Sequence, residues 1–222
     1  MAATRLHFSE ELKALNDRVL EMCGDVDSML GLAMRALSEH SVGLAEEVLT
    51  RDDEVDRLDL EIESECMRLI ALQQPMGRDL RLIGTAIKVI TDLERIGDHA
   101  VDIAKVARKL AHEPLQRPLV DMPRLSNAVR EMLKDVMVAF VTHDLSLVTR
   151  VVASDDNVDA MFHILRDELH ETMRRNSSQV VQASYLLFVA HYLERIADHI
   201  VNIAERVHYT ETGQLMPSSD QK

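Results

Sequence analysis

The chain has 222 residues, of which 46% are hydrophobic and 28% are charged, so it carries enough apolar surface to build a buried core. Its formal net charge of −13 argues against nucleic-acid binding, which needs clustered lysine and arginine, and against direct binding to an anionic membrane surface. Gly, Pro and aromatic residues are scarce and Trp is absent, whereas helix-favouring residues are abundant. The composition therefore predicts an all-α fold.

Apolar residues recur at helical spacing along most of the chain, and this periodicity predicts six helices. Their approximate ranges are 8–41, 44–73, 77–111, 121–143, 145–175 and 179–209. Gly43 and the turn around Pro75 separate the first three of these helices. Three prolines within ten residues predict a linker at 112–120, and the polar residues 210–222 are expected to form a frayed tail.

Three features of the chain predict a cytoplasmic protein. The longest strongly apolar stretch, Val180–Ala190, is about half of a membrane span, and Met1–Phe8 has no apolar signal-peptide run. Cys23 and Cys66 are too few for a disulfide framework and lack metal-ligand spacing, as expected of a protein kept in a reducing compartment.

The chain contains an internal duplication. Residues 93–104 align with residues 193–204 at an offset of 100, with nine of twelve positions identical, and residues 52–56 align with 155–159 at an offset of 103. The change of offset means that the first copy has three extra residues, for which the turn around Pro75 is a natural place. We therefore expect two tandem three-helix bundles, 1–111 and 121–209, related by an approximate two-fold axis.

Acidic residues border the packed face of the third helix in each copy. Leu93, Ile96, Ala100 and Ile103 form an apolar stripe, and beside it Glu94, Asp98 and Asp102 follow one another at a spacing of four. The second copy repeats Glu194 and Asp198, with Asn202 in the third position. Like charges four residues apart destabilise a helix, so these acidic rows are expected to have a neutralising partner.

The second helix of each copy adds another pair of acids at the same spacing. If each pair converges on the carboxylates of the next helix, each half has four carboxylates, a set suited to Mg²⁺, Mn²⁺ or iron. The candidate metal ligands are Asp52, Asp56, Glu94, Asp98 and Asp102 in the first half and Asp155, Asp159, Glu194 and Asp198 in the second.

A purely structural role for these charges is the alternative. Arg95 and Arg195 stand three residues before an aspartate, within reach of an intrahelical ion pair, and Asp52 and Asp155 could cap the starts of their helices. His99 and His199 point away from the neighbouring aspartates and are expected to form interhelical hydrogen bonds rather than to act as metal ligands.

The sequence of Leu93–Ala104, its second copy at Leu193–Ala204, and the turn at Ala71–Arg81 resemble the PhoU family. The resemblance implies a two-repeat helical bundle and a homodimer that restrains the phosphate-starvation response and modulates phosphate uptake. It also implies an adaptor between the ATPase subunit of the phosphate ABC transporter and a sensor histidine kinase, meeting the membrane only through these partners. Some members hold multinuclear metal clusters on (Glu/Asp)-x-x-x-Asp motifs, so iron, manganese, magnesium or zinc is expected on the carboxylates above.

A carboxylate-bridged di-metal enzyme and a metal-free scaffolding bundle are the alternative functions. The enzyme would need two Glu-x-x-His motifs, but Glu205–His208 has the counterpart Lys105–Arg108 in the first half. The sequence contains no nucleophile elbow, no H-E-x-x-H motif and no phosphate-binding glycine loop. We therefore expect a protein that is not an enzyme and that responds to the transporter through contacts.

Overall fold

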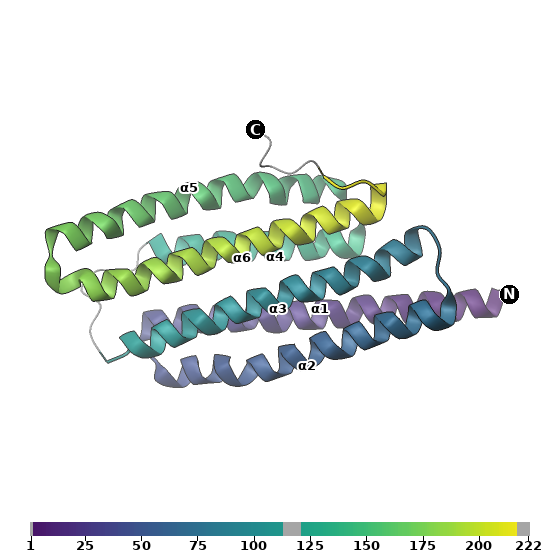
Figure 1. Ribbon diagram of the computed structural model, residues 1–222, viewed down its shortest axis with the longest axis horizontal. Coiled ribbons are helices and arrows are strands. Elements are labelled where there is room, and N and C mark those ends of the chain that lie inside the picture. Colours follow the sequence, from purple (N-terminus) through teal and green to yellow (C-terminus); the bar gives the residue numbers. More distant parts are fainter. Residues whose placement is uncertain (1, 113–120, 217–222) are drawn as a thin grey trace.

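The computed structural model describes residues 2–112 and 121–216, with side chains described from residue 7 onward, and within these ranges it contains helices and no strand (Figure 1). The α-helices are α1 (Ala2–Glu39), α2 (Val42–Gln73), α3 (Arg78–Leu110), α4 (Asp121–Thr142), α5 (Leu145–Arg175) and α6 (Val180–Thr212), and a short 3₁₀ turn, Ser177–Gln179, precedes α6. The predicted all-α fold is confirmed.

The starts of α2 and α5 are capped by residues that lie directly before them. The Ser41 hydroxyl accepts a hydrogen bond from the backbone N–H of Leu44 at 3.3 Å, and the Asp144 carboxylate accepts one from Ser146 at 2.8 Å. Asp52 and Asp155 lie well inside the same helices. The suggestion that these two aspartates cap helix starts is therefore wrong, because nearer residues already satisfy the free N–H groups.

Two of the predicted helices are too short at one end. The helix α1 begins at Ala2 rather than near residue 8, and α6 continues to Thr212, where Gly213 adopts a φ of 72° and closes the helix. Thr210, predicted to lie in the frayed tail, is buried, and its hydroxyl lies 2.6 Å from that of Thr85 in α3. The predicted linker 112–120 falls, apart from its first residue, outside the described residues, as does the end of the predicted tail.

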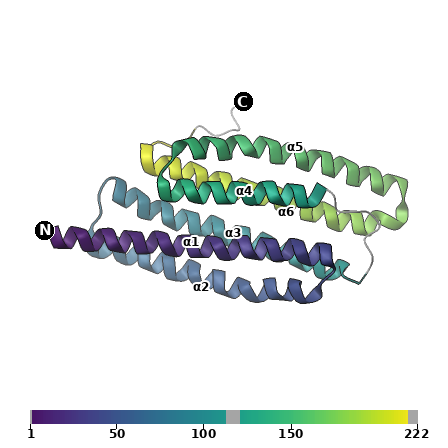
Figure 2. The same cartoon turned by 180° about the vertical axis from the view of Figure 1, so that it is seen from behind.

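The six described helices form two antiparallel three-helix units, α1–α3 and α4–α6, that lie side by side (Figure 1). The helices α3 and α6 run antiparallel to each other at the centre, and each also contacts both other helices of its own unit. On the opposite side α1 and α4 are neighbours (Figure 2). The predicted pair of tandem three-helix bundles is confirmed, and α3 and α6 join them.

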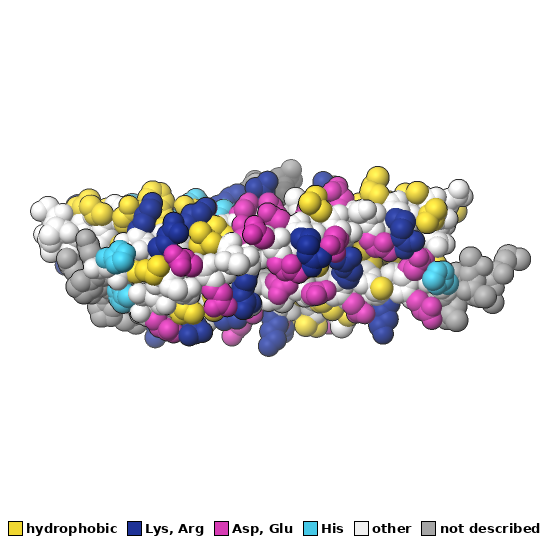
Figure 3. All heavy atoms as spheres, turned by 90° about the horizontal axis from the view of Figure 1, so that it is seen from below, with side chains coloured by type: hydrophobic (Ala, Val, Ile, Leu, Met, Phe, Trp, Pro, Cys, Tyr) yellow, Lys and Arg dark blue, Asp and Glu magenta, His cyan; other side chains and the backbone are white. Residues whose placement is uncertain are grey.

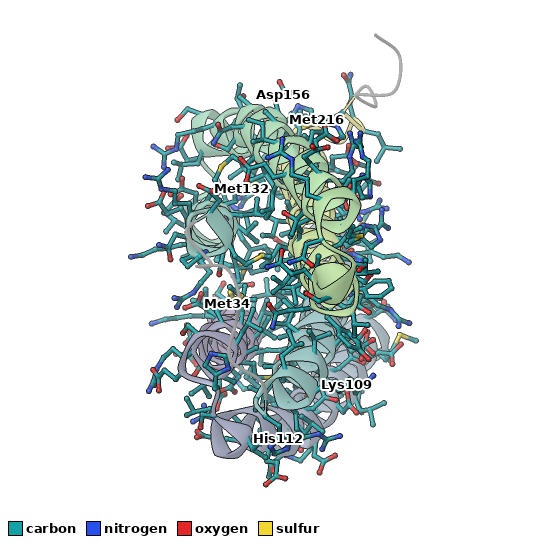
Figure 4. The ribbon with its side chains drawn as sticks, turned by 90° about the vertical axis from the view of Figure 1, so that its left-hand side faces the viewer. Met34, Lys109, His112, Met132, Asp156 and Met216 are labelled. Atoms are coloured by element: carbon teal, nitrogen blue, oxygen red, sulfur yellow. The ribbon has the colours of Figure 1, made fainter. Side chains whose placement is uncertain are left out.

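A view along the helices shows this arrangement in cross-section (Figure 4). The helix α4, labelled at Met132, lies above α1, labelled at Met34, while α6 lies above α3 on the other side. The apolar stripe of α3, Leu93 to Ile103, and its counterpart in α6, Leu193 to Ile203, are both fully buried. Burial of both stripes supplies the hydrophobic contact that holds each unit together and fixes α3 and α6 at the centre.

Within the described ranges, none of the helices combines the length and the apolar character needed to cross a membrane. Cys23 and Cys66 are buried in different helices. Burial raises the pKa of each thiol to about 12, so both stay protonated near neutral pH.

Candidate functional site

The acids of α2 and α3 converge in the first half. An ideal Cβ built on Gly97 of α3 would lie 3.9 Å from Oδ1 of Asp52, which places this α2 carboxylate against α3. Burial and the negative charges of Asp56 and Asp98 raise the pKa of Asp52. Burial and the charge of Asp98 likewise raise the pKa of Glu94, with smaller contributions from α2 acids and opposition from Arg95. Asp52, Asp56, Glu94 and Asp98 therefore form one acidic cluster, the first cluster.

The corresponding acids of α5 and α6 form a second cluster, Asp155, Asp159, Glu194 and Asp198. Burial, reinforced by the charges of Asp159 and Asp198, raises the pKa of Asp155 to about 7. Burial also raises the pKa values of Glu194 and Asp198. Ionising all four carboxylates therefore costs more free energy here than it would in water.

The second cluster contains buried oxygens that lack a hydrogen bond. Oδ1 of Asp155 and Oε2 of Glu194 have no hydrogen-bond partner among the described residues. Oε2 of Glu194 lies 3.2 Å from Nδ1 of His191, but without hydrogen-bond geometry. Buried polar atoms of folded proteins are nearly always hydrogen-bonded or bound to an ion or water. These two oxygens therefore have lone pairs that a cation or a water molecule could use.

An arginine on the same helix partly neutralises each cluster. Arg95 contacts Asp98 at 3.0 Å, and Arg195 contacts Asp198 at 2.5 Å. The predicted intrahelical ion pairs are thus confirmed in both halves. Each arginine balances one of four carboxylates, so each cluster keeps an excess of negative charge.

The donor set fits a hard cation, because carboxylate oxygens are the ligands that such ions prefer. In the described part of the chain, no three His, Cys, Asp or Glu groups already lie close enough together to enclose an ion. Carboxylates that repel one another stay apart, and a bound cation would have to draw them inward. The metal site at these residues stays a prediction.

Asp102 has different neighbours from the other predicted ligands. Its carboxylate pairs with Lys105 at 3.0 Å, and its charge acts on His99 and on Tyr192 of α6. Two residues near the clusters were not predicted from the sequence: Asp59, whose charge acts on Glu94, and His191, beside Glu194. Both stand three residues from a predicted ligand, a helical spacing that could have identified them.

A polar contact joins α3 to α6 between the two clusters. Nδ1 of His199 lies 2.9 Å from Oδ1 of Asp92, and Nδ2 of Asn202 donates to the same oxygen at 3.3 Å. In the same interface, the His99 ring of α3 stacks on Tyr192 of α6 with 5.6 Å between ring centroids. The predicted interhelical hydrogen bond is confirmed for His199, with Asp92 as a partner that was not predicted. It is not confirmed for His99, which contacts α6 by ring stacking and whose Nδ1 has no hydrogen-bond partner among the described residues.

On the opposite side of the molecule, a groove of about 740 Å³ runs between α1 and α4. Its walls are mostly apolar and include Leu20, Cys23, Met137, Val138 and Val141. The sequence analysis did not predict this groove, because the pattern within a helix does not say how far apart two helices of different halves will lie.

Acidic side chains gather over the middle of the face seen in Figure 3, where they are interspersed with lysine and arginine. Exposed charges along α2 are paired with one another, for example Arg57 with both Glu54 and Glu61. An acidic surface of this kind suits a cation or a protein with a basic face.

Two copies of one three-helix unit, each with a cluster of carboxylates where its second and third helices meet, define a duplicated helical bundle with paired acidic sites. The profile of the PhoU domain family matches this chain twice, over residues 19–107 and 122–207. The chain therefore belongs to the PhoU family.

Known proteins similar to this chain align with it over nearly its whole length. A protein of Clostridium acetobutylicum, described as a phosphate-specific transport system accessory protein PhoU homolog, is 37% identical over 98% of this chain and 100% of the relative. A protein of Aquifex aeolicus with the same description is 39% identical over 93% of this chain and 94% of the relative.

Two crystal structures share the fold. PhoU from Pseudomonas aeruginosa superposes with a TM-score of 0.89 at 33% identity, covering 93% of this chain and all of that one. The phosphate transport system regulatory protein PhoU from Streptococcus pneumoniae has a TM-score of 0.88 at 30% identity, covering 95% of this chain and all of that one.

Proposed function

We propose that this protein is an accessory protein of a phosphate-specific transport system and that it restrains the phosphate-starvation response when phosphate is plentiful. The observation that carries this proposal is the double match to the PhoU domain, together with relatives that are described as such accessory proteins and align over 93% or more of this chain. Both repeats are present, so the whole duplicated unit of the family is available for the role.

The mode of action that we propose is that of an adaptor. In this role the protein contacts the ATPase subunit of the phosphate ABC transporter and a sensor histidine kinase, and it reaches the membrane only through them. The net charge of −13 and the acidic face in Figure 3 support protein partners with basic surfaces and disfavour nucleic acid. A cytoplasmic homodimer is the form in which we expect the protein to act.

A regulator is favoured over a di-metal enzyme by the surroundings of its one Glu-x-x-His motif. Nδ1 of His208 lies 3.1 Å from the backbone oxygen of Gln214, so this imidazole is engaged with the turn that follows α6. The equivalent position in the first half is Arg108. A di-iron bundle needs two such motifs facing each other.

We further propose that the two acidic clusters bind iron, manganese, magnesium or zinc. The buried oxygens of Asp155 and Glu194 without hydrogen-bond partners among the described residues, and the raised pKa of Asp155, support this proposal. A bound cation would compensate the repulsion among the carboxylates and so stabilise the packing of α2 on α3 and of α5 on α6. If no metal binds, a metal-free scaffolding bundle is the remaining alternative.

The regulatory role is tested by deleting the gene and measuring expression of phosphate-starvation genes in phosphate-rich medium. We expect these genes to be switched on, and to be repressed again by the wild-type gene but not by Leu93→Asp, which buries a charge in the core of α3. Silent starvation genes in the deletion strain would contradict the regulator assignment.

The adaptor role needs a separate experiment. Purified protein, immobilised without a metal-binding tag, should retain the transporter ATPase subunit and the cytoplasmic part of the sensor kinase. Retention of neither would contradict the adaptor proposal while leaving the regulatory result intact.

A further inference from the structure

Two histidines meet where the central helices α3 and α6 cross. The ring centroids of His99 and His199 are 5.8 Å apart, and the ring planes are tilted by 38°. Both residues are only partly exposed, and they come from equivalent positions of the two repeats. This histidine pair joins the halves and is distinct from the acidic clusters, each of which lies between helices of one half.

Asp92 fixes the orientation of the His199 ring. Its carboxylate oxygen contacts Nδ1 of His199 at 2.9 Å and accepts a hydrogen bond from Asn202 at 3.3 Å. The side chains of His199 and Asp92 are 17% and 16% exposed, so water competes little for this contact. A carboxylate on one ring nitrogen makes that nitrogen the proton donor and leaves Nε2 with a free lone pair. Metal-binding histidines commonly have such a carboxylate on the ring nitrogen that does not bind the metal.

The His99 ring is packed, but one of its nitrogens lacks a hydrogen-bond partner in the described part of the chain. One face stacks on Tyr192, and Nδ1 is buried without a hydrogen-bond partner among the described residues. Buried ring nitrogens normally have a partner, and a metal ion is one that accepts a lone pair. The charges facing His99 are Asp98 and Asp102 of α3 and Arg195 of α6, and its neighbour His199 is in the same electrostatic network. Both carboxylates are themselves paired, with Arg95 and Lys105, so the unpartnered Nδ1 of His99 is the feature that calls for a ligand.

We propose that His99 and His199 together bind one divalent cation of the borderline class, such as Cu²⁺, Ni²⁺ or Zn²⁺, with water completing its coordination. Imidazole nitrogen selects these ions over Mg²⁺ and Mn²⁺, which prefer oxygen. Two imidazoles on one ion, each with a metal–nitrogen distance of about 2.0–2.1 Å, have ring centroids roughly 5–6 Å apart, which matches the observed separation. The proposed site has two protein ligands and not three, in agreement with the described residues, among which no group of three donors is preassembled.

Such a site would link the two repeats directly, because each repeat supplies one of the two ligands. It does not depend on the proposed phosphate regulation or on metal in the acidic clusters. The experiment below therefore distinguishes nitrogen ligands from oxygen ligands.

Metal-free full-length protein without an affinity tag is titrated with Cu²⁺, and binding is followed by calorimetry and by electron paramagnetic resonance. We expect one copper per chain to show nitrogen superhyperfine coupling from two imidazoles, and any copper on the acidic clusters to show oxygen ligands only. His99→Asn/His199→Asn should abolish this signal and lower the Cu²⁺ affinity at least tenfold. The matched control is His163→Asn/His170→Asn, which removes two exposed imidazoles of α5 and should leave signal and affinity unchanged.

A further variant, Asp92→Asn, separates ligand loss from general damage to the fold. It keeps both imidazoles and removes the charge behind His199, and it should lower the affinity about tenfold while preserving the two-nitrogen signal. The proposal is overturned if wild-type copper has only oxygen ligands, or if the nitrogen signal survives in His99→Asn/His199→Asn. If that double variant does not fold, by its circular dichroism spectrum, the Asp92→Asn result and the two single histidine variants decide in the same way.

Discussion

Arg130 of α4 holds Asp27 of α1 through two hydrogen bonds, from Nε to Oδ1 at 2.6 Å and from Nη2 to Oδ2 at 2.7 Å. This ion pair crosses from one repeat to the other and lines the groove between α1 and α4. It therefore adds a directional contact on the side of the molecule opposite the α3–α6 pair.

The strength of this ion pair is open to measurement by a double-mutant cycle. The two side chains are 37% and 38% exposed, so screening by water limits their coupling, and we expect about 0.5–1 kcal/mol from Arg130→Ala, Asp27→Ala and the double variant. Urea unfolding supplies the three free energies. The exposed surface pair Arg35–Glu39 on α1 is the control, and its coupling is expected to be weaker than that of Arg130 with Asp27. A coupling above 2 kcal/mol or of opposite sign would contradict the expectation.

The raised pKa of Asp155 predicts that the metal-free protein is more stable in mild acid than at alkaline pH. Its folded pKa of about 7 lies far above the unfolded value of about 3.9, so between these values the folded state binds a proton that the unfolded state lacks. Stability from this group therefore increases as pH falls from about 8 to about 5. Melting temperature measured across this range, with chelator present, should show that slope.

The variant Asp155→Asn should flatten the pH dependence, because the amide does not titrate. Asp167→Asn, which changes a 70% exposed aspartate of the same helix, should leave the slope as in the wild type. Some slope is expected to remain from the raised pKa values of Glu194 and Asp198. Equal slopes in the wild type and in Asp155→Asn would show that this carboxyl is not the group responsible.

Metal in the acidic clusters predicts a melting temperature that rises with Mn²⁺ and falls with chelator. A metal bound only by the folded state at 100 times its Kd adds about 2.7 kcal/mol to stability. Asp98→Asn/Asp198→Asn should remove this response, whereas His99→Asn/His199→Asn should keep it. In the absence of metal the same aspartate substitutions relieve repulsion among the carboxylates, so they should leave the melting temperature unchanged or slightly higher unless the lost ion pairs with Arg95 and Arg195 outweigh that gain. A wild-type melting temperature that changes with neither chelator nor Mn²⁺ would rule out a stabilising metal.

Gly97→Ala is expected to stabilise the protein by about 0.5–1 kcal/mol, because glycine inside a helix costs about that much relative to alanine. The added Cβ would lie 3.5 Å from the nearest heavy atom, Cγ1 of Val55, which is ordinary contact, and the second repeat has Ala197 at this position. Gly97→Leu is the contrasting variant, since its larger side chain must enter the α2–α3 interface and should cost about 1–3 kcal/mol. Urea unfolding of both variants checks whether the free energy of unfolding rises in Gly97→Ala and falls in Gly97→Leu.

Local patterns were sufficient for most of the fold. The 3.6-residue periodicity located the six helices because each one has to bury a single apolar face, and the repeated motif showed that Leu93 and Leu193 occupy equivalent buried positions. Spacing within α2 and α3 placed each acid pair on one face of its helix, but whether those faces meet was left open, and the structure supplied the answer. The cap assigned to Asp52 was wrong because its helix begins ten residues earlier, at Val42, where Ser41 is the cap.

The sequence alone determined the helices, the duplication and the acidic residues, because these follow from periodicity within one helix and from identity between two segments. Only the tertiary structure decided how α3 crosses α6, and with it the contact between Asp92 and His199 and the meeting of His199 with His99. The tertiary structure also decided that α6 extends to Thr212, since Thr210 is buried against Thr85 of the other repeat. The register between two helices is set by how their side chains interlock, and no pattern within either helix contains it.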